Sequence, residues 1–179
     1  MSQAAEFFAQ SIQDAEVLLA HFDQMERKSP EDGEVLKRAG LVMAMTAWET
    51  YVEDRLHEDV SARLQAFDGS SVGNFMRRRL DEELKRLHNP DTEKTRRLFR
   101  VFLDVDVTKG WKWDNFQPAD AKKALNRYLS IRGDVVHRAK DNDSPHPVKR
   151  PDLDKAIRFL KGLVGAMDSF LDNAQSSSS

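Results

Sequence analysis

An arginine and a histidine in the last third of the chain have the chemistry that a catalytic site would need. Arg132 and His137 lie five positions apart in a segment with helical character. A guanidinium stays charged and can hold phosphate oxygens, whereas an imidazole exchanges protons near neutral pH. Asp134 precedes His137 by three residues, so it can share a helix face with His137 and orient the imidazole. This spacing also arises by chance, and such an arginine is usually a salt-bridged surface group.

The helix that carries Arg132 is predicted to begin at Pro118 and to extend to about residue 140. Arg132 belongs to the series of residues that this helix is predicted to turn toward the core. A permanent charge there is costly unless a polar or anionic group contacts it. The other members of that series are apolar: Ala121, Leu125, Tyr128, Val135 and Ala139.

An ideal helix places Arg132 and His137 roughly 140° apart, so one straight helix does not aim both side chains at one small target. Three arrangements remain open at this point. Gly133 loosens the turn, the helix begins close to this segment, or a second subunit completes the site. The third arrangement suits a two-fold dimer in which the same helix meets its own copy.

The rest of the chain predicts an all-α fold, a bundle of five or six helices. Glycine and proline together make up only 14 of 179 residues, and apolar residues recur every three or four positions. We expect a single domain over 3–172 and a flexible serine-rich tail over 173–179. The helices are predicted over 3–25, 29–67, 72–87, 92–103, 118–140 and from 151 onward.

Composition excludes several classes of protein. The chain has no cysteine, which rules out disulfide scaffolds, cysteine nucleophiles and cysteine-ligated metals. Its formal net charge of −2 excludes a basic coat for nucleic acid but leaves room for a local patch. No apolar run is long enough to span a membrane, and the first ten residues do not resemble a secretory signal. We expect a cytoplasmic protein without a membrane partner.

A basic segment and an aromatic segment each allow two interpretations. Residues 77–100 hold nine Lys and Arg against five acids, so they could follow a phosphate backbone or form a solvated face with pairs such as Asp81–Lys85 and Glu82–Arg86. The candidates for RNA binding are Arg77, Arg78, Arg79, Arg96 and Arg97. Trp111, Trp113 and Phe116 could stack on unpaired bases, but such residues more often pack a loop onto the core.

Glu49, Glu53 and His57 step by four along the predicted helix 29–67. Three ligands on one helix are a weak metal site, so we predict no metal and no cofactor. A polar face near the site is the better interpretation, in which Glu49 or Glu53 holds Arg132 in place. His21, His88 and His146 show no constellation and are predicted to be ordinary surface residues.

The segment from Arg132 to His137 resembles the Arg-x4–6-His motif of the HEPN superfamily (higher eukaryotes and prokaryotes nucleotide-binding). The segment 47–54, with Trp48 and Glu49, is similar to the Trp/Glu-containing helix of stand-alone prokaryotic HEPN proteins, and the order of the helices is similar too. The resemblance covers about residues 3–172.

This resemblance implies a metal-independent endoribonuclease that works as a homodimer, often as a toxin or defence effector. It places Arg132 as the clamp on the phosphate and His137 as general base or acid, with Asp134, Glu49 and Glu53 in supporting positions. RNA is the implied substrate, and an antitoxin or defence-system protein is the implied partner. Some members continue the motif as His-x-Tyr, and the tyrosine is then modified. This chain has Ala139 at that position, which argues against such regulation.

Two other functions remain possible on the same residues. One is a catalytically inactive HEPN-type binding or dimerisation module. The other is a helical adaptor in which Arg132 closes a salt bridge between subunits.

Overall fold

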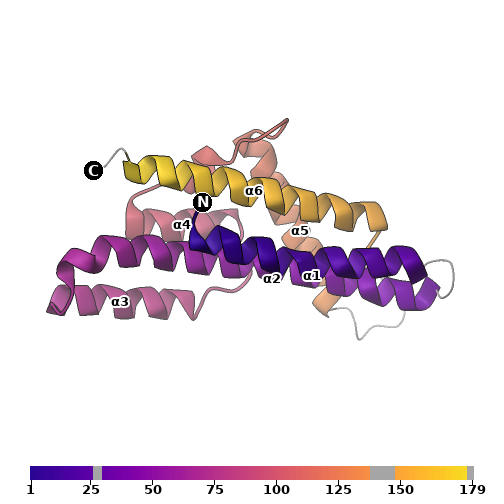
Figure 1. The fold of residues 1–179 in the computed structure, drawn as a ribbon, viewed down its shortest axis with the longest axis horizontal. Helices are drawn as coiled ribbons and strands as arrows, with labels where there is room; N and C mark the ends of the chain where they lie inside the picture. Colours follow the sequence, from indigo (N-terminus) through magenta and orange to yellow (C-terminus); the bar gives the residue numbers. More distant parts are fainter. Residues whose placement is uncertain (26–29, 138–147, 177–179) are drawn as a thin grey trace.

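The computed structural model describes residues 1–25, 30–137 and 148–176, with backbone only at 30–32, 137, 175 and 176. This part of the chain is all-α, as predicted, with six α-helices, two short 3-10 helices and no strand (Figure 1). The elements are α1 (Gln3–Met25), α2 (Pro30–Leu64), η1 (Gln65–Phe67), α3 (Ser71–Leu84), α4 (Thr92–Leu103), η2 (Val107–Gly110), α5 (Pro118–His137) and α6 (Arg150–Ser176).

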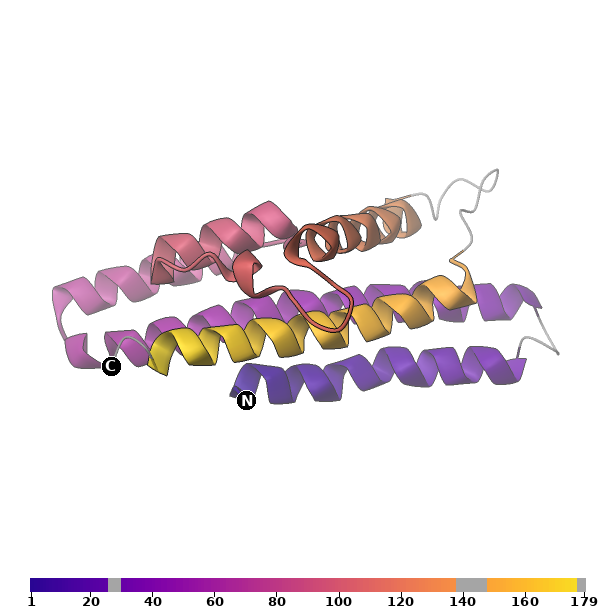
Figure 2. The same cartoon turned by 90° about the horizontal axis from the view of Figure 1, so that it is seen from above.

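The three longest helices, α1, α2 and α6, pack side by side, with α1 antiparallel to the other two (Figure 2). Their apolar residues repeat at helical spacing, so each helix buries one stripe against its neighbours. Ile12, Trp48 and Leu160 lie at the centre of this core with no exposed surface. The stripes predicted from the sequence for these helices are buried throughout.

The helices α4 and α5 lie on the side of α2 that is opposite α1 (Figure 2). α4 begins at a cap in which the Asp91 carboxylate accepts a hydrogen bond from the Lys94 amide at 2.8 Å. It ends at Asp104, whose left-handed backbone (φ 56°) closes the last turn. α5 begins at Pro118 and stays helical through Gly133 to His137. Of the three arrangements left open by the sequence, the one in which a helix begins close to Arg132 is therefore excluded, and the predicted start at Pro118 is confirmed.

The aromatic segment between α4 and α5 packs onto the core. Trp111 is fully buried with its ring edge-on to Trp48, at 6.2 Å between centroids. Trp113 stacks on Phe116 at 4.7 Å, and both rings contact Phe159 of α6. Gly162 permits this approach, because a Cβ there would lie 2.1 Å from the indole nitrogen of Trp113. The packing interpretation of these residues is confirmed.

A buried ionic cluster joins α2 to α6 and to the start of α1. The Arg55 side chain is 2 % exposed and faces three aspartates, with Nη1 at 3.0 Å from Asp168, Nη2 at 2.8 Å from Asp172 and Nε at 3.2 Å from Asp59. Ser2 also donates to Asp168, from its amide at 3.0 Å and its hydroxyl at 2.5 Å. Burial alone would lower the pKa of Arg55, but these carboxylates outweigh it and raise the pKa.

The helix ends differ slightly from those predicted. The long second helix gives way to η1 after Leu64, and α6 runs to Ser176, so its last turn lies in the predicted tail. The domain boundaries 3–172 and 173–179 stay predictions, and the serines at 177–179 lie outside the described residues. Within the described residues, no helix has the length and apolar character to cross a membrane.

Candidate functional site

Arg132 lies part-buried on α5, where its Nη1 donates a hydrogen bond to the side-chain oxygen of Asn89. Its Nε is buried and makes no hydrogen bond within the described residues. Leu125 and Tyr128, earlier in the same series, are buried in the core as predicted. A neutral amide therefore offsets part of the cost of placing a guanidinium in this series, and the buried Nε donor remains unsatisfied within the described residues.

The turn between α3 and α4 presents Asn89 to Arg132, and its conformation is closely fixed. Asn89 has a left-handed backbone (φ 50°), which asparagine tolerates better than most residues. The next residue, Pro90, accepts a hydrogen bond from the buried indole of Trp48 at 2.9 Å. The amide of Thr92 donates to Asn126 of α5 at 3.1 Å. The turn is thus held by α2 and α5, the two helices that carry the predicted site residues.

Two glutamates of α2 lie close to the same turn. Glu49 places its Oε1 at 3.9 Å from Nδ1 of His88, the residue directly before Asn89. Burial, followed by repulsion from Glu49 and Asp54, raises the pKa of Glu53, and His88 opposes this shift. Among the described residues, no ion pair within 4 Å joins Arg132 to either glutamate. Asn89, and not a glutamate as expected, holds the guanidinium.

The other two motif residues lie further along α5. Asp134 is part-buried, and His137 is the last residue of the helix. The side chain of His137 lies outside the described residues, so the predicted pairing of Asp134 with His137 stays a prediction. α5 stays helical through Gly133, and completion of the site by a second subunit stays a prediction.

The predicted RNA-binding arginines lie on α3 and α4, and most of them pair with acids. Arg77 pairs with Asp68, Arg96 with Glu93 at 2.5 Å, and both Arg79 and Arg97 with Glu83 at 2.7 and 3.1 Å. Arg78 is exposed and forms no ion pair within the described residues. Among the described residues, no ion pair within 4 Å joins Asp81 to Lys85 or Glu82 to Arg86. RNA binding by this surface stays a prediction.

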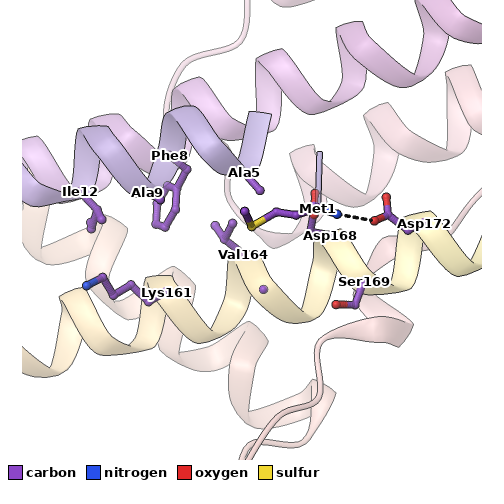
Figure 3. Close-up of a pocket in the computed structure, with 11 residues that line it drawn as sticks. Met1, Ala5, Phe8, Ala9, Ile12, Lys161, Val164, Asp168, Ser169 and Asp172 are labelled. Carbon is purple, nitrogen blue, oxygen red and sulfur yellow. Dashed lines mark ion pairs between the residues drawn. The ribbon is translucent and has the colours of Figure 1, made fainter. Parts of the chain in front are cut away.

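A separate cavity of about 300 Å³ lies between α1 and α6 (Figure 3). Its lining is largely apolar, and its charged groups already have partners. Lys161 pairs with Glu16 at 2.5 Å, while Asp168 belongs to the Arg55 cluster. None of the predicted site residues lines this cavity, so it is distinct from the candidate site around Arg132.

No group of three acidic or histidine side chains in the described part of the chain could hold a metal ion. The possible metal site formed by Glu49, Glu53 and His57 on one helix therefore gains no further support. Sequence reasoning missed Asn89, and it predicted His88 to be a surface residue, which its 77 % exposed side chain confirms. In the sequence, these two residues were marked only by their place in the turn His88-Asn89-Pro90-Asp91. The contact between Asn89 and Arg132 joins positions 43 residues apart, so local spacing does not predict it.

Comparison with known proteins places this chain in a family. The family model RiboL-PSP-HEPN matches residues 9–173, which is nearly the whole described fold. No curated protein and no solved structure matches the chain. The match confirms the resemblance to the HEPN superfamily predicted from Arg132, His137 and the Trp48 helix, and it supports a nuclease-like domain. On this evidence the chain belongs to the RiboL-PSP-HEPN family.

Proposed function

We propose that this protein is a metal-independent endoribonuclease that acts as a homodimer and serves as a toxin or defence effector. The observation that carries the proposal is the state of Arg132. The guanidinium is part-buried and tethered through Nη1 to Asn89, while its Nη2 donates no hydrogen bond within the described residues. An arginine held in this way keeps donors for a phosphate, and the family match makes a nuclease the first choice.

The proposed reaction cleaves the RNA backbone in three coupled events. The 2′-hydroxyl loses a proton and its oxygen attacks the adjacent phosphorus. The bond from phosphorus to the 5′-oxygen then breaks, and that oxygen gains a proton. Arg132 stabilises the negative charge that develops on the phosphate, and His137 transfers protons as base or acid. The products are a 2′,3′-cyclic phosphate and a 5′-hydroxyl.

The partners follow from this chemistry. The substrate is RNA, because DNA lacks the 2′-hydroxyl that serves as nucleophile. A homodimer would supply two copies of the motif to one cleft, and an antitoxin or defence-system protein would restrain the nuclease. The exposed Arg78 on α3 and its neighbouring arginines would contribute to RNA affinity.

Purified protein should cleave single-stranded RNA in the presence of excess EDTA, since no step uses a metal ion. DNA of the same sequence should stay intact, and so should RNA with one 2′-deoxy nucleotide at the cleavage position. Gel electrophoresis with end-group analysis measures both results. Loss of cleavage on adding EDTA, or equal cleavage of the 2′-deoxy substrate, would contradict the proposal. A pure protein that binds RNA without cutting it would favour the inactive binding module.

A further inference from the structure

Cleavage by this route needs two proton transfers on opposite sides of the phosphorus. Arg132 cannot make either transfer, because a guanidinium does not give up its proton in proteins. The motif supplies one imidazole in each subunit, at His137. In the proposed homodimer the second role falls either to the other copy of His137 or to a further titratable group in the same subunit, which motivates a search around Arg132 for such a group. This inference rests on the proposed ribonuclease activity.

Among the described residues, His88 is the histidine in the turn that contacts Arg132. It directly precedes Asn89, whose side chain accepts the hydrogen bond from Arg132. Its side chain is 77 % exposed, so substrate can reach it, and Glu49 on α2 is its ion-pair partner when the imidazole is protonated. Because Nδ1 is the nitrogen that faces Glu49, Nε2 is the nitrogen left for a substrate atom.

The backbone around His88 is fixed despite the exposure of the side chain. Its carbonyl accepts a hydrogen bond from the ammonium group of Lys94 at 2.7 Å. Asn89 is tied to α5 through Arg132, and Pro90 is tied to α2 through the indole of Trp48 at 2.9 Å. Three consecutive residues are thus anchored to three different helices. Such anchoring is what a proton-transfer group needs, because the transfer requires a defined distance to the substrate atom.

The charged groups around the His88 imidazole are suited to catalysis at a phosphate. Glu49 and Glu53 face it from α2, Lys94 contacts its backbone from α4, and the guanidinium of Arg132 on α5 contacts the side chain of the next residue, Asn89. A substrate phosphate bound to Arg132 would therefore lie at the turn that carries His88. Burial, and then the charge of Glu49, raise the pKa of Glu53.

We propose that His88 is the general acid of the reaction and donates its Nε2 proton to the leaving 5′-oxygen. His137 then takes the proton of the 2′-hydroxyl, whose oxygen forms the new bond to phosphorus. The bond between phosphorus and the 5′-oxygen breaks, and the proton from His88 completes the 5′-hydroxyl. Hydrolysis of the cyclic phosphate, or exchange with water, returns the proton to His88. Glu49 acts as a positioning residue that orients the imidazole.

The test compares two RNA substrates that differ at one atom. One has the ordinary 5′-oxygen at the cleavage position, and the other has sulfur in its place, a leaving group that departs without a proton. His88→Ala should cut the ordinary RNA about 10²-fold more slowly than the unmodified protein. It should cut the sulfur-containing RNA at nearly the unmodified rate, because that substrate does not need the acid.

His21→Ala is the matched control. His21 is an exposed histidine on α1, which lies across α2 from α5 (Figure 2). This variant should cleave both substrates normally. A His88→Ala protein that cuts ordinary RNA at the unmodified rate would overturn the role of His88 and leave the nuclease intact. An equal loss on both substrates would also overturn the acid role. If the unmodified protein cuts neither RNA, the proposed function itself fails.

Discussion

Replacing Arg132 with alanine should slow RNA cleavage by about 10²–10³-fold, the usual effect of removing one group that stabilises transition-state charge. The protein should stay folded, because within the described residues the side chain makes a single hydrogen bond, to Asn89. The loss should appear in the rate at saturating RNA, since the guanidinium contributes most when negative charge develops on the phosphate. Single-turnover cleavage of one defined RNA in EDTA, with circular dichroism of each variant, measures this effect.

Arg127→Ala is the matched control for that experiment. Arg127 lies on the same helix, is exposed, and pairs only loosely with Asp152 at 3.7 Å. The two variants lose the same charge from α5, so a general weakening of RNA attraction would affect both of them. We expect Arg127→Ala to cleave within a few-fold of the unmodified protein. Equal losses in the two variants would show that Arg132 acts through charge alone.

Replacing Arg55 with alanine should lower the free energy of unfolding by about 3–5 kcal/mol, the cost of breaking a buried ion pair on one side. The guanidinium is enclosed by Asp59, Asp168 and Asp172, and its loss leaves their carboxylates to repel one another. A domain with ordinary stability of about 5–15 kcal/mol would lose a large share of it. Urea unfolding monitored by circular dichroism provides the measurement.

An exposed arginine of α6 gives the comparison for Arg55. Arg158 pairs with Asp154 one turn away, and its side chain is 70 % exposed. Exposed pairs contribute at most about 1 kcal/mol, so Arg158→Ala should leave the unfolding midpoint almost unchanged. Similar small losses in both variants would contradict the view that the Arg55 cluster holds α1, α2 and α6 together.

The apolar pattern of the sequence was sufficient to predict the helices and their buried faces. Phe8 and Ile12, Trp48 and Val52, and the corresponding series of α6 are buried as their spacing indicates. This works because a helix that faces a core must repeat its apolar residues every three or four positions. The break at Asn89-Pro90-Asp91 also placed the start of α4 correctly, at Thr92.

Pairings between distant positions could not be predicted in the same way. Arg55 and Asp168 are 113 residues apart, and nothing near either residue indicates that they meet. The same is true of Asn89 and Arg132, so the sequence pointed to Glu49 or Glu53 as the group that holds the guanidinium. The motif itself was predicted because its residues lie within one helix. The turn that supports it depends on how α2, α4 and α5 pack together.

The most direct test of the central claim is whether Arg132 and His137 act on the same phosphate. Cleavage of one RNA in EDTA should be measured for Arg132→Ala, His137→Ala and the double variant. Residues that serve one reaction step are not additive, so we predict that the double variant is about as slow as the slower single variant. A double variant whose fold-loss in cleavage rate equals the product of the two single losses would contradict the account. Cleavage by all three variants at the unmodified rate would point instead to a contaminating nuclease.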